Sequence, residues 1–169
     1  MNRRKPLSSE FILSILDVDI STGVCRWKEV SKFHARLKGK VAGCQEQPIG
    51  KLPRWFIKIG SVSYKRAYLV FMVAHGYWPA LIDHIDGNSL NDSVNNLREA
   101  TVTQNAWNHR TRAKKSNLPM GIRLNYGKYT VRIGFNRKLI TIGTFAELSD
   151  AVNAYKSKRS ELYGEFSAL

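Results

Sequence analysis

Cysteine is scarce in this chain, which has only Cys25 and Cys44 among its 169 residues. The two do not form a Cys-x-x-Cys pair, so the spacing typical of structural zinc sites is missing. A small disulfide-stabilised scaffold would need more cysteine than this. We therefore expect two reduced thiols, as is typical of a cytoplasmic protein, and a fold stabilised by a hydrophobic core.

Long apolar segments are also missing. No apolar run approaches the roughly 18 residues that a membrane-spanning helix needs. The basic residues 1–6 are not followed by the long apolar region of a signal peptide. The apolar fraction of 43% nevertheless suffices for folded cores, and the length suits one ordinary domain or two or three small ones.

Acidic residues are few, because 13 Asp and Glu stand against 27 Lys and Arg, a net charge of +14. Residues 1–60 hold twelve basic and five acidic residues, net +7, and residues 110–169 hold twelve and four, net +8. Residues 61–109 hold three basic and four acidic residues, net −1. Two basic blocks of this size favour a polyanionic partner. We expect nucleic acid, with an anionic membrane surface as the minor alternative.

Apolar spacing and turn residues predict short helices and strands. The first part of the chain should hold a short capped helix over about 8–16, strands near Val24 and across 55–59, and a helix over 65–75 that ends before Gly76. A basic linker over 110–117 follows the central region. The last part is then predicted to hold strands at about 121–126, 128–135 and 139–145 and a helix over about 147–163.

The most informative motif runs from Ile82 to Asn88 and places the carboxylate of Asp83 beside His84. A carboxylate is a hard oxygen ligand suited to Mg²⁺ or Mn²⁺. Histidine accepts a proton from water more readily near neutral pH than other side chains. A cation and a base beside one another can activate water for the hydrolysis of a phosphodiester.

Amide side chains follow at fixed distances. Asn95 and Asn96 open the next element, and Thr101 and Gln104 have the spacing of a helix capping box. That box would place Asn105 in the first turn of a short helix, from which it could point back toward Asp83. Each residue also has an ordinary structural interpretation, as a turn, a cap or a buried histidine. Their joint order in a basic protein favours the chemical interpretation.

The segment from Arg66 to Arg110 closely resembles the HNH endonucleases of the phage and homing type. The matching residues are Arg66, Gly76-Tyr77-Trp78-Pro79, Ile82 to Asn88, Asn91-Asp92, Asn95 to Thr101 and Gln104-Asn105. The resemblance implies a ββα-metal finger that cuts DNA to leave 5′-phosphate and 3′-hydroxyl ends.

Within that resemblance four positions take roles. Asp83 would bind the divalent metal, His84 would be the general base, and Asn96 would brace the loop that positions it. Asn105 would be the second protein ligand of the metal. Many family members have a histidine at this last position, so His109 is an alternative, although its spacing fits less well.

The C-terminal part alternates apolar and polar residues along its strands, so that Arg123 and Arg132 fall on one face. Together with Lys128, Arg137 and Lys138 at the turns, and Lys114 and Lys115 in the linker, they would form a DNA-binding surface. An ordinary solvated face is the alternative.

A second resemblance favours the DNA-binding interpretation. The segments Gly121 to Arg123, Tyr129 to Ile133, Ile142 to Phe145, Asp150-Ala151, Ala154-Tyr155 and Gly164 to Phe166 are similar to an AP2-type DNA-binding domain. Tyr129 stands where that family often has tryptophan, which keeps an aromatic ring.

We therefore predict an α+β protein with three parts: a basic β-rich segment (1–62), an HNH nuclease core (63–112) and an AP2-like three-stranded antiparallel sheet with one helix (113–169). The predicted function is a metal-dependent DNA endonuclease of phage homing type, active in the host cytoplasm. One Mg²⁺ or Mn²⁺ ion is expected, with double-stranded DNA as partner, no membrane and no small-molecule cofactor. The protein would act as a monomer or a dimer. The alternative is a DNA-binding regulator whose HNH core is inactive.

Overall fold

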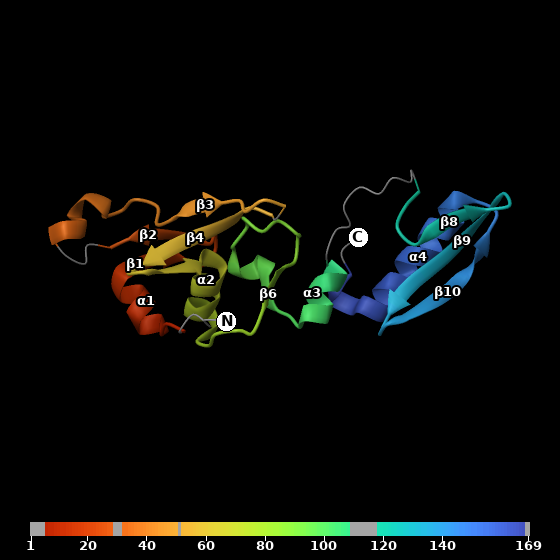
Figure 1. Ribbon diagram of the computed structural model, residues 1–169. Helices are drawn as coiled ribbons and strands as arrows, with labels where there is room; N and C mark the ends of the chain where they lie inside the picture. Colours follow the sequence, from red (N-terminus) through yellow and green to blue (C-terminus); the bar gives the residue numbers. More distant parts are fainter. Residues whose placement is uncertain (1–5, 29–31, 51, 109–117, 168–169) are drawn as a thin grey trace. The chain divides into compact units, whose positions relative to one another are not determined.

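A computed structural model describes residues 6–28, 32–50, 52–108 and 118–167 and shows the expected mixed α/β fold (Figure 1). Contacts divide the chain into two compact units, one up to Val102 and one from Thr103 onward. The division into three parts at residues 62 and 112 stays a prediction about modules.

The first unit contains the helices α1 (Ser9–Ile15) and α2 (Arg66–His75), the 3₁₀ helices η1 (Lys32–Leu37) and η2 (Val94–Asn96), and the strands β1 (Leu16–Asp19), β2 (Val24–Trp27), β3 (Cys44–Glu46), β4 (Arg54–Ile59), β5 (Val62–Lys65), β6 (Ile82–His84) and β7 (Leu97–Glu99). The helix α3 (Val102–Asn108) spans the boundary. The second unit contains β8 (Ile122–Asn125), β9 (Lys128–Phe135), β10 (Lys138–Phe145), α4 (Leu148–Tyr163) and the 3₁₀ helix η3 (Gly164–Phe166).

The first unit is built around α2, a helix that the sequence predicted. This helix ends at Gly76, whose φ of 75° is the left-handed conformation that glycine adopts without a steric penalty. Leu69 and Val70 are fully buried in a core shared with Ile12 of α1 and Ile57 of β4. Burial of each such side chain stabilises the fold by roughly 1.5–3 kcal/mol, so residues on both sides of position 62 contribute to one core.

Three antiparallel sheets surround this core: the hairpin β1–β2, the three-stranded sheet β3-β4-β5 and the hairpin β6–β7. The register of β6–β7 pairs Asp83 with Arg98 and His84 with Leu97. All three residues of β6 are buried. The motif therefore begins inside the unit and reaches the surface only in the loop that follows β6.

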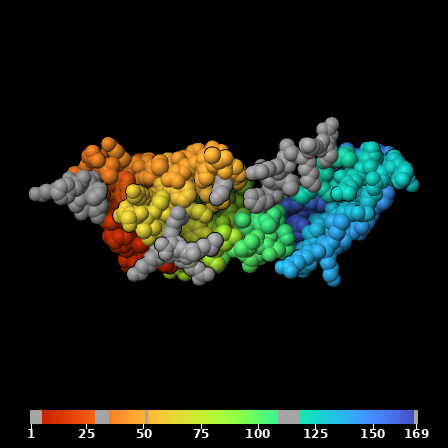
Figure 2. Space-filling model, viewed as in Figure 1, coloured from red at the N-terminus to blue at the C-terminus, as the bar shows by residue number. Residues whose placement is uncertain are grey.

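The second unit is a three-stranded antiparallel sheet in the order β10-β9-β8, with α4 packed on one face. The core of this unit lies between the sheet and the helix. It is formed by Ile122, Val131 and Ile133 of the sheet and by Ala151 and Tyr155 of α4. The predicted strands and helix are confirmed, with their ends within two residues. The space-filling view shows the β9–β10 hairpin (blue) at the surface of this unit (Figure 2).

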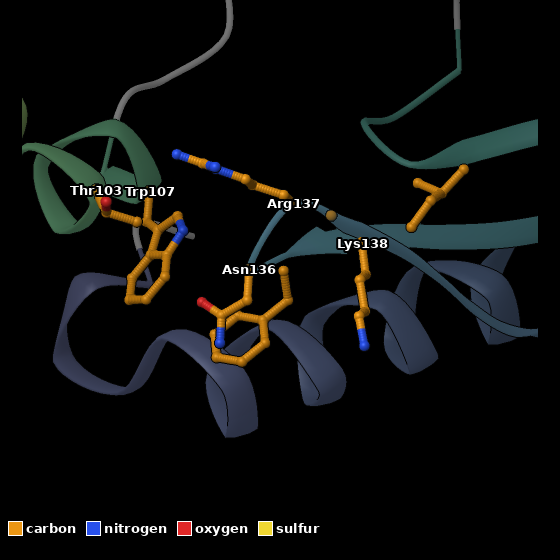
Figure 3. A pocket seen from close by; sticks show the side chains of 8 residues that line it. Thr103, Trp107, Asn136, Arg137 and Lys138 are labelled. Atoms are coloured by element: carbon orange, nitrogen blue, oxygen red, sulfur yellow. The ribbon is translucent and has the colours of Figure 1, made fainter.

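Residues 103–108 of α3 pack in the second unit (Figure 3). The indole of Trp107 stacks on Tyr163, with centroids 4.8 Å apart and planes 5° from parallel. Arg159, buried on the apolar side of α4, donates from Nη2 to the carbonyl of Trp107 over 2.6 Å and from Nη1 to the hydroxyl of Tyr155 over 3.3 Å. These contacts attach the end of α3 to α4.

Two further expectations are met within the described ranges. Cys25 and Cys44 are free thiols, the first buried and the second exposed. No helix in those ranges is long and apolar enough to cross a membrane.

Candidate active site

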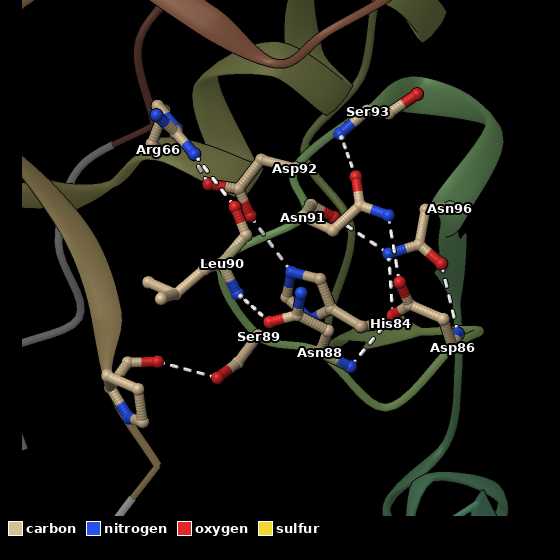
Figure 4. Close-up of polar contacts among 11 residues, drawn as sticks. Arg66, His84, Asp86, Asn88, Ser89, Leu90, Asn91, Asp92, Ser93 and Asn96 are labelled. Carbon is tan, nitrogen blue, oxygen red and sulfur yellow. Dashed lines mark hydrogen bonds and ion pairs between the residues drawn. The ribbon is translucent and has the colours of Figure 1, made fainter.

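The candidate site lies around β6 and the loop that links it to β7 (Figure 4). Asp83 and His84 are consecutive on β6 and face different partners, as neighbouring residues of a strand do. Asn96 ends η2 and contacts the same loop. Three of the four predicted central residues therefore belong to one local structure.

His84 forms a buried chain of polar contacts with Asp92 and Arg66. The Nε2 atom of His84 is 2.9 Å from Oδ1 of Asp92, and Oδ2 of Asp92 accepts from Nε of Arg66 over 2.8 Å. The Arg66 guanidinium also donates from Nη2 to the carbonyl of Leu90 and lies 4.8 Å from the centre of the Trp55 ring. Asp92 is only 2% exposed, so its charge depends on these two partners.

This contact determines which nitrogen of His84 can act as a base. An ionised carboxylate only accepts hydrogen bonds, so Nε2 must donate to Asp92. In the neutral imidazole the lone pair then lies on Nδ1. Asp92 also faces the positive charge that the ring acquires when Nδ1 takes up a proton.

Asn96 braces the loop after β6. Its Oδ1 accepts from the backbone N–H of Asp86 over 3.0 Å, and its Nδ2 donates to Oδ1 of Asp86 and to the carbonyl of Asn91. Its own carbonyl accepts from the N–H of Ile85. Gly87, at φ 72°, supplies the left-handed residue of the turn. A single buried amide thus connects both ends of the loop.

Residues far upstream support the same loop. The carbonyl of Ile20 accepts from the N–H of Val94 over 2.9 Å, and Ser89 donates to the carbonyl of Pro53 over 2.5 Å. Gly23 lies against Asp92 so closely that a Cβ at Gly23 would be 2.3 Å from the Asp92 carbonyl carbon. The β1–β2 turn therefore packs directly against Asp92, the residue that contacts His84. Pro53, just before β4, contacts the same loop through Ser89.

Asp83 has a cationic partner on the adjacent strand. Its Oδ2 accepts from Nε of Arg98 over 2.9 Å and from Nη2 over 2.8 Å. The pair follows from the β6–β7 register, in which these two residues are directly opposite. A cation that binds Asp83 would therefore share the carboxylate with Arg98.

Asn105 belongs to the second unit and lies in the first turn of α3, as predicted. Its predicted pairing with Asp83 remains a prediction. His109, the alternative, falls outside the described residues. Within the described ranges no cluster of three or more His, Cys, Asp or Glu side chains forms a ready metal site. The donor types of Asp83 and Asn105, a carboxylate and an amide oxygen, nevertheless suit a hard divalent cation.

Two basic side chains of the first unit lie near His84. Arg54 and Lys65 line a small recess together with His84, Ser89 and Asp92. Both cations are partly exposed, whereas His84 and Asp92 are buried. The recess therefore offers positive charge beside the imidazole.

The predicted DNA-binding residues of the second unit are exposed. Arg123 and Arg132 lie on the face of the sheet opposite α4, where they pair across strands with Thr130 and Thr141. The remaining three lie at the hairpin turns: Lys128, Arg137 and Lys138. Lys114 and Lys115 fall outside the described residues.

Sequence reasoning missed the roles of Asp92, Arg66 and Arg98. Arg66 and Asp92 are 26 positions apart, and nothing in local spacing links them. The available signal was composition, because Asp92 is one of four acidic residues in the near-neutral centre. Arg98 could have been assigned to Asp83 once β6 and β7 were placed in antiparallel register.

Comparisons with known proteins identify the family of the chain. Residues 64–107 match the family described as HNH endonuclease. The protein named "Uncharacterized HNH endonuclease L560" of Acanthamoeba polyphaga mimivirus is 31% identical over 131 residues, which cover 72% of this chain and 68% of that protein. "Protein 3.8" of Escherichia phage T7 is 51% identical over 39 residues, 23% of this chain and 30% of that protein. No solved structure matches the chain. The chain belongs to the HNH endonuclease family.

The Asp92 contacts predict a large loss of stability in Asp92→Asn. This change leaves the buried guanidinium of Arg66 without its carboxylate, which typically costs about 3–5 kcal/mol. Urea unfolding followed by circular dichroism measures the free energy of unfolding. The double variant Arg66→Gln/Asp92→Asn should lose less than the two single variants together, because it buries no uncompensated charge. Additive losses would contradict the pairing.

The hydrogen bonds of Asp86 predict that the stability of the fold depends on pH. Partial burial raises the pKa of this carboxyl, but hydrogen bonds from the Asn91 side chain, the Asn88 N–H and the Asn96 side chain, with His84 nearby, lower it below its ordinary 3.8. The ionised form therefore stabilises the fold above pH about 4, and this contribution is lost as the pH falls below that value.

The difference in unfolding free energy between wild type and Asp86→Asn should then be on the order of 1 kcal/mol at pH 7 and should shrink in acid. Asp17→Asn, which removes an exposed carboxylate on β1, is the matched control. A difference that stays constant from pH 7 to pH 3 would rule out this role of the Asp86 charge.

Proposed function

We propose that this protein is a metal-dependent endonuclease that hydrolyses phosphodiester bonds of DNA, with His84 as the general base. The observation that carries the proposal is the His84–Asp92–Arg66 chain, in a member of the HNH endonuclease family. Asp92 holds the ring with Nε2–H as donor, so Nδ1 is the nitrogen that accepts the proton of the attacking water. Asn96 keeps the adjoining loop in place during this step.

Asp83 and Asn105 would hold one divalent cation, Mg²⁺ or Mn²⁺. When bound, such an ion supplies positive charge against the phosphate and the departing 3′ oxygen. Arg98 orients the carboxylate of Asp83 through its two contacts with Oδ2. Arg54 and Lys65, beside His84, would neutralise phosphate charge near the reacting group.

The basic second unit would supply most of the affinity for double-stranded DNA. Its sequence resembles an AP2-type domain, and its exposed sheet face presents Arg123 and Arg132 with threonine neighbours. Contacts of this kind bind phosphates and can also contact guanine edges in the major groove. A homing role in a phage is the proposed biological setting, consistent with the mimivirus and T7 relatives.

Cleavage of supercoiled plasmid in the presence of Mg²⁺ or Mn²⁺ tests the activity. Wild-type protein should nick or linearise the plasmid, and His84→Ala should cut at least 100-fold more slowly, since general bases typically contribute 10²- to 10⁴-fold. Binding of His84→Ala to the same DNA should stay close to wild type. Cutting by His84→Ala at the wild-type rate would remove His84 as the base.

The regulator hypothesis is tested by the same assay. It is favoured by the Arg98 contacts, which already neutralise part of the Asp83 charge. Wild-type protein that binds DNA tightly yet leaves it uncut with every divalent ion would establish binding without catalysis.

The sheet face predicts a separate effect on binding. Arg123→Ala with Arg132→Ala should reduce duplex affinity and lower the slope of log Kd against log salt by about two, because two phosphate contacts are lost. Fluorescence anisotropy at several salt concentrations measures both. Lys156→Ala with Lys158→Ala, on α4, removes the same charge from the opposite side of the sheet. Equal effects of the two pairs would exclude the sheet face as the binding surface.

A further inference from the structure

A cleft in the second unit lies between α3 and the β9–β10 turn (Figure 3). It has a volume of about 590 Å³, within the range of small-ligand sites. Its lining residues are Thr103, Trp107, Gly134, Phe135, Asn136, Arg137, Lys138 and Leu139.

The aromatic side of the cleft is formed by Trp107, which is half-buried, and Phe135. Tyr163 lies 5° from parallel to Trp107 and Phe135 lies 27° from parallel, with centroids 4.8 Å and 5.5 Å away. The centroids of Phe135 and Tyr163 are only 6.2 Å apart, so both rings lie on the same side of the indole. Rings on opposite faces would be much further from each other. The other face is therefore covered by no ring among the described residues, and a flat group can stack there.

The opposite side of the cleft is cationic. Arg137 and Lys138 are exposed on the turn, with Asn136 beside them, and no acidic residue is among the described lining. An aromatic face opposite cations suits a group that is flat at one end and anionic at the other. An apolar peptide would not match this charge.

The β9–β10 turn holds Arg137 in a backbone conformation that is unfavourable for arginine. Asn136 and Arg137 both have positive φ, 49° and 64°, which is the two-residue hairpin turn that favours Asn-Gly. Arginine at the second position is strained where glycine would not be. Strain of this kind, at an exposed position where packing does not demand arginine, is typical of residues that contact a ligand.

The cleft is distinct from the predicted metal position. Thr103 and Trp107 are four positions apart and lie on the same side of α3, whereas Asn105 is about half a turn away from both. A group in the cleft would therefore leave Asn105 accessible.

We propose that this cleft binds an unpaired nucleotide of a DNA strand, with the base stacked on Trp107 and the phosphates beside Arg137 and Lys138. The bases of a duplex are covered by their neighbours, so only an unpaired base can present its face to the indole. The proposal rests on the proposed function only in taking DNA as the partner, because it needs neither His84 nor a metal.

The test uses the full chain in EDTA, so that no cutting occurs, and a single-stranded 12-nucleotide DNA that contains one 2-aminopurine. Wild-type protein should quench the probe. Trp107→Leu should bind the strand about fivefold to a hundredfold more weakly, whereas Trp107→Phe should retain most of the quenching. Binding of the corresponding duplex should be unchanged by Trp107→Leu.

Arg137→Gly separates binding from folding. It should fold at least as well as wild type, with an unchanged or higher Tm, because glycine suits the turn. It should nevertheless weaken binding of the strand more than Lys156→Ala, which removes an exposed charge from α4.

Three results would overturn the proposal. They are strand binding unchanged in Trp107→Leu and Arg137→Gly, equal losses for strand and duplex in Trp107→Leu, and competition by free thymidine monophosphate as effective as competition by the strand. His84→Ala protein should quench the probe like wild type. Failure of the nuclease proposal and failure of the cleft proposal therefore give different results.

Discussion

The carboxylate of Asp92, buried between the guanidinium of Arg66 and the imidazole of His84, is the contact on which the candidate site depends. A buried charge is tolerated only with partners, so this carboxylate connects the start of α2, the strand β6 and the loop that follows it. Movement of any one of the three would leave an unpaired charge. The same contact selects the nitrogen of His84 that holds the lone pair, so stability and chemistry share one interaction.

The charged residues discussed in the two units have different surroundings. In the first unit the acidic residues Asp83, Asp86 and Asp92 are all engaged by named partners, which gives a rigid site of nearly neutral charge. In the second unit Arg123 and Arg132 point away from the core of the sheet, where their charge is available to a polyanion. The +14 of the whole chain therefore lies mostly outside the candidate site.

Local patterns were enough to predict most of the fold. The helix before Gly76, the three C-terminal strands and α4 all have strong periodicity and clear turn residues, and each is present. The sequence also indicated His84 and Asn96 as candidate site residues. It included Asp92 among the matching residues but gave it no role, because a contact between residues 66, 84 and 92 depends on how α2 packs against β6. The Trp107 cleft was missed for the same reason, since its walls are residues near 105 and 136.

The close packing of Gly23 against Asp92 bears on whether the motif can be moved from one gene to another. The family match begins at residue 64, yet the surface that confines Asp92 is contributed some 40 positions earlier. A graft of residues 64–107 into another protein would carry His84 and Asp92 without the glycine turn that packs against Asp92. Transfer of the local structure around the candidate site would therefore require the β1–β2 hairpin as well.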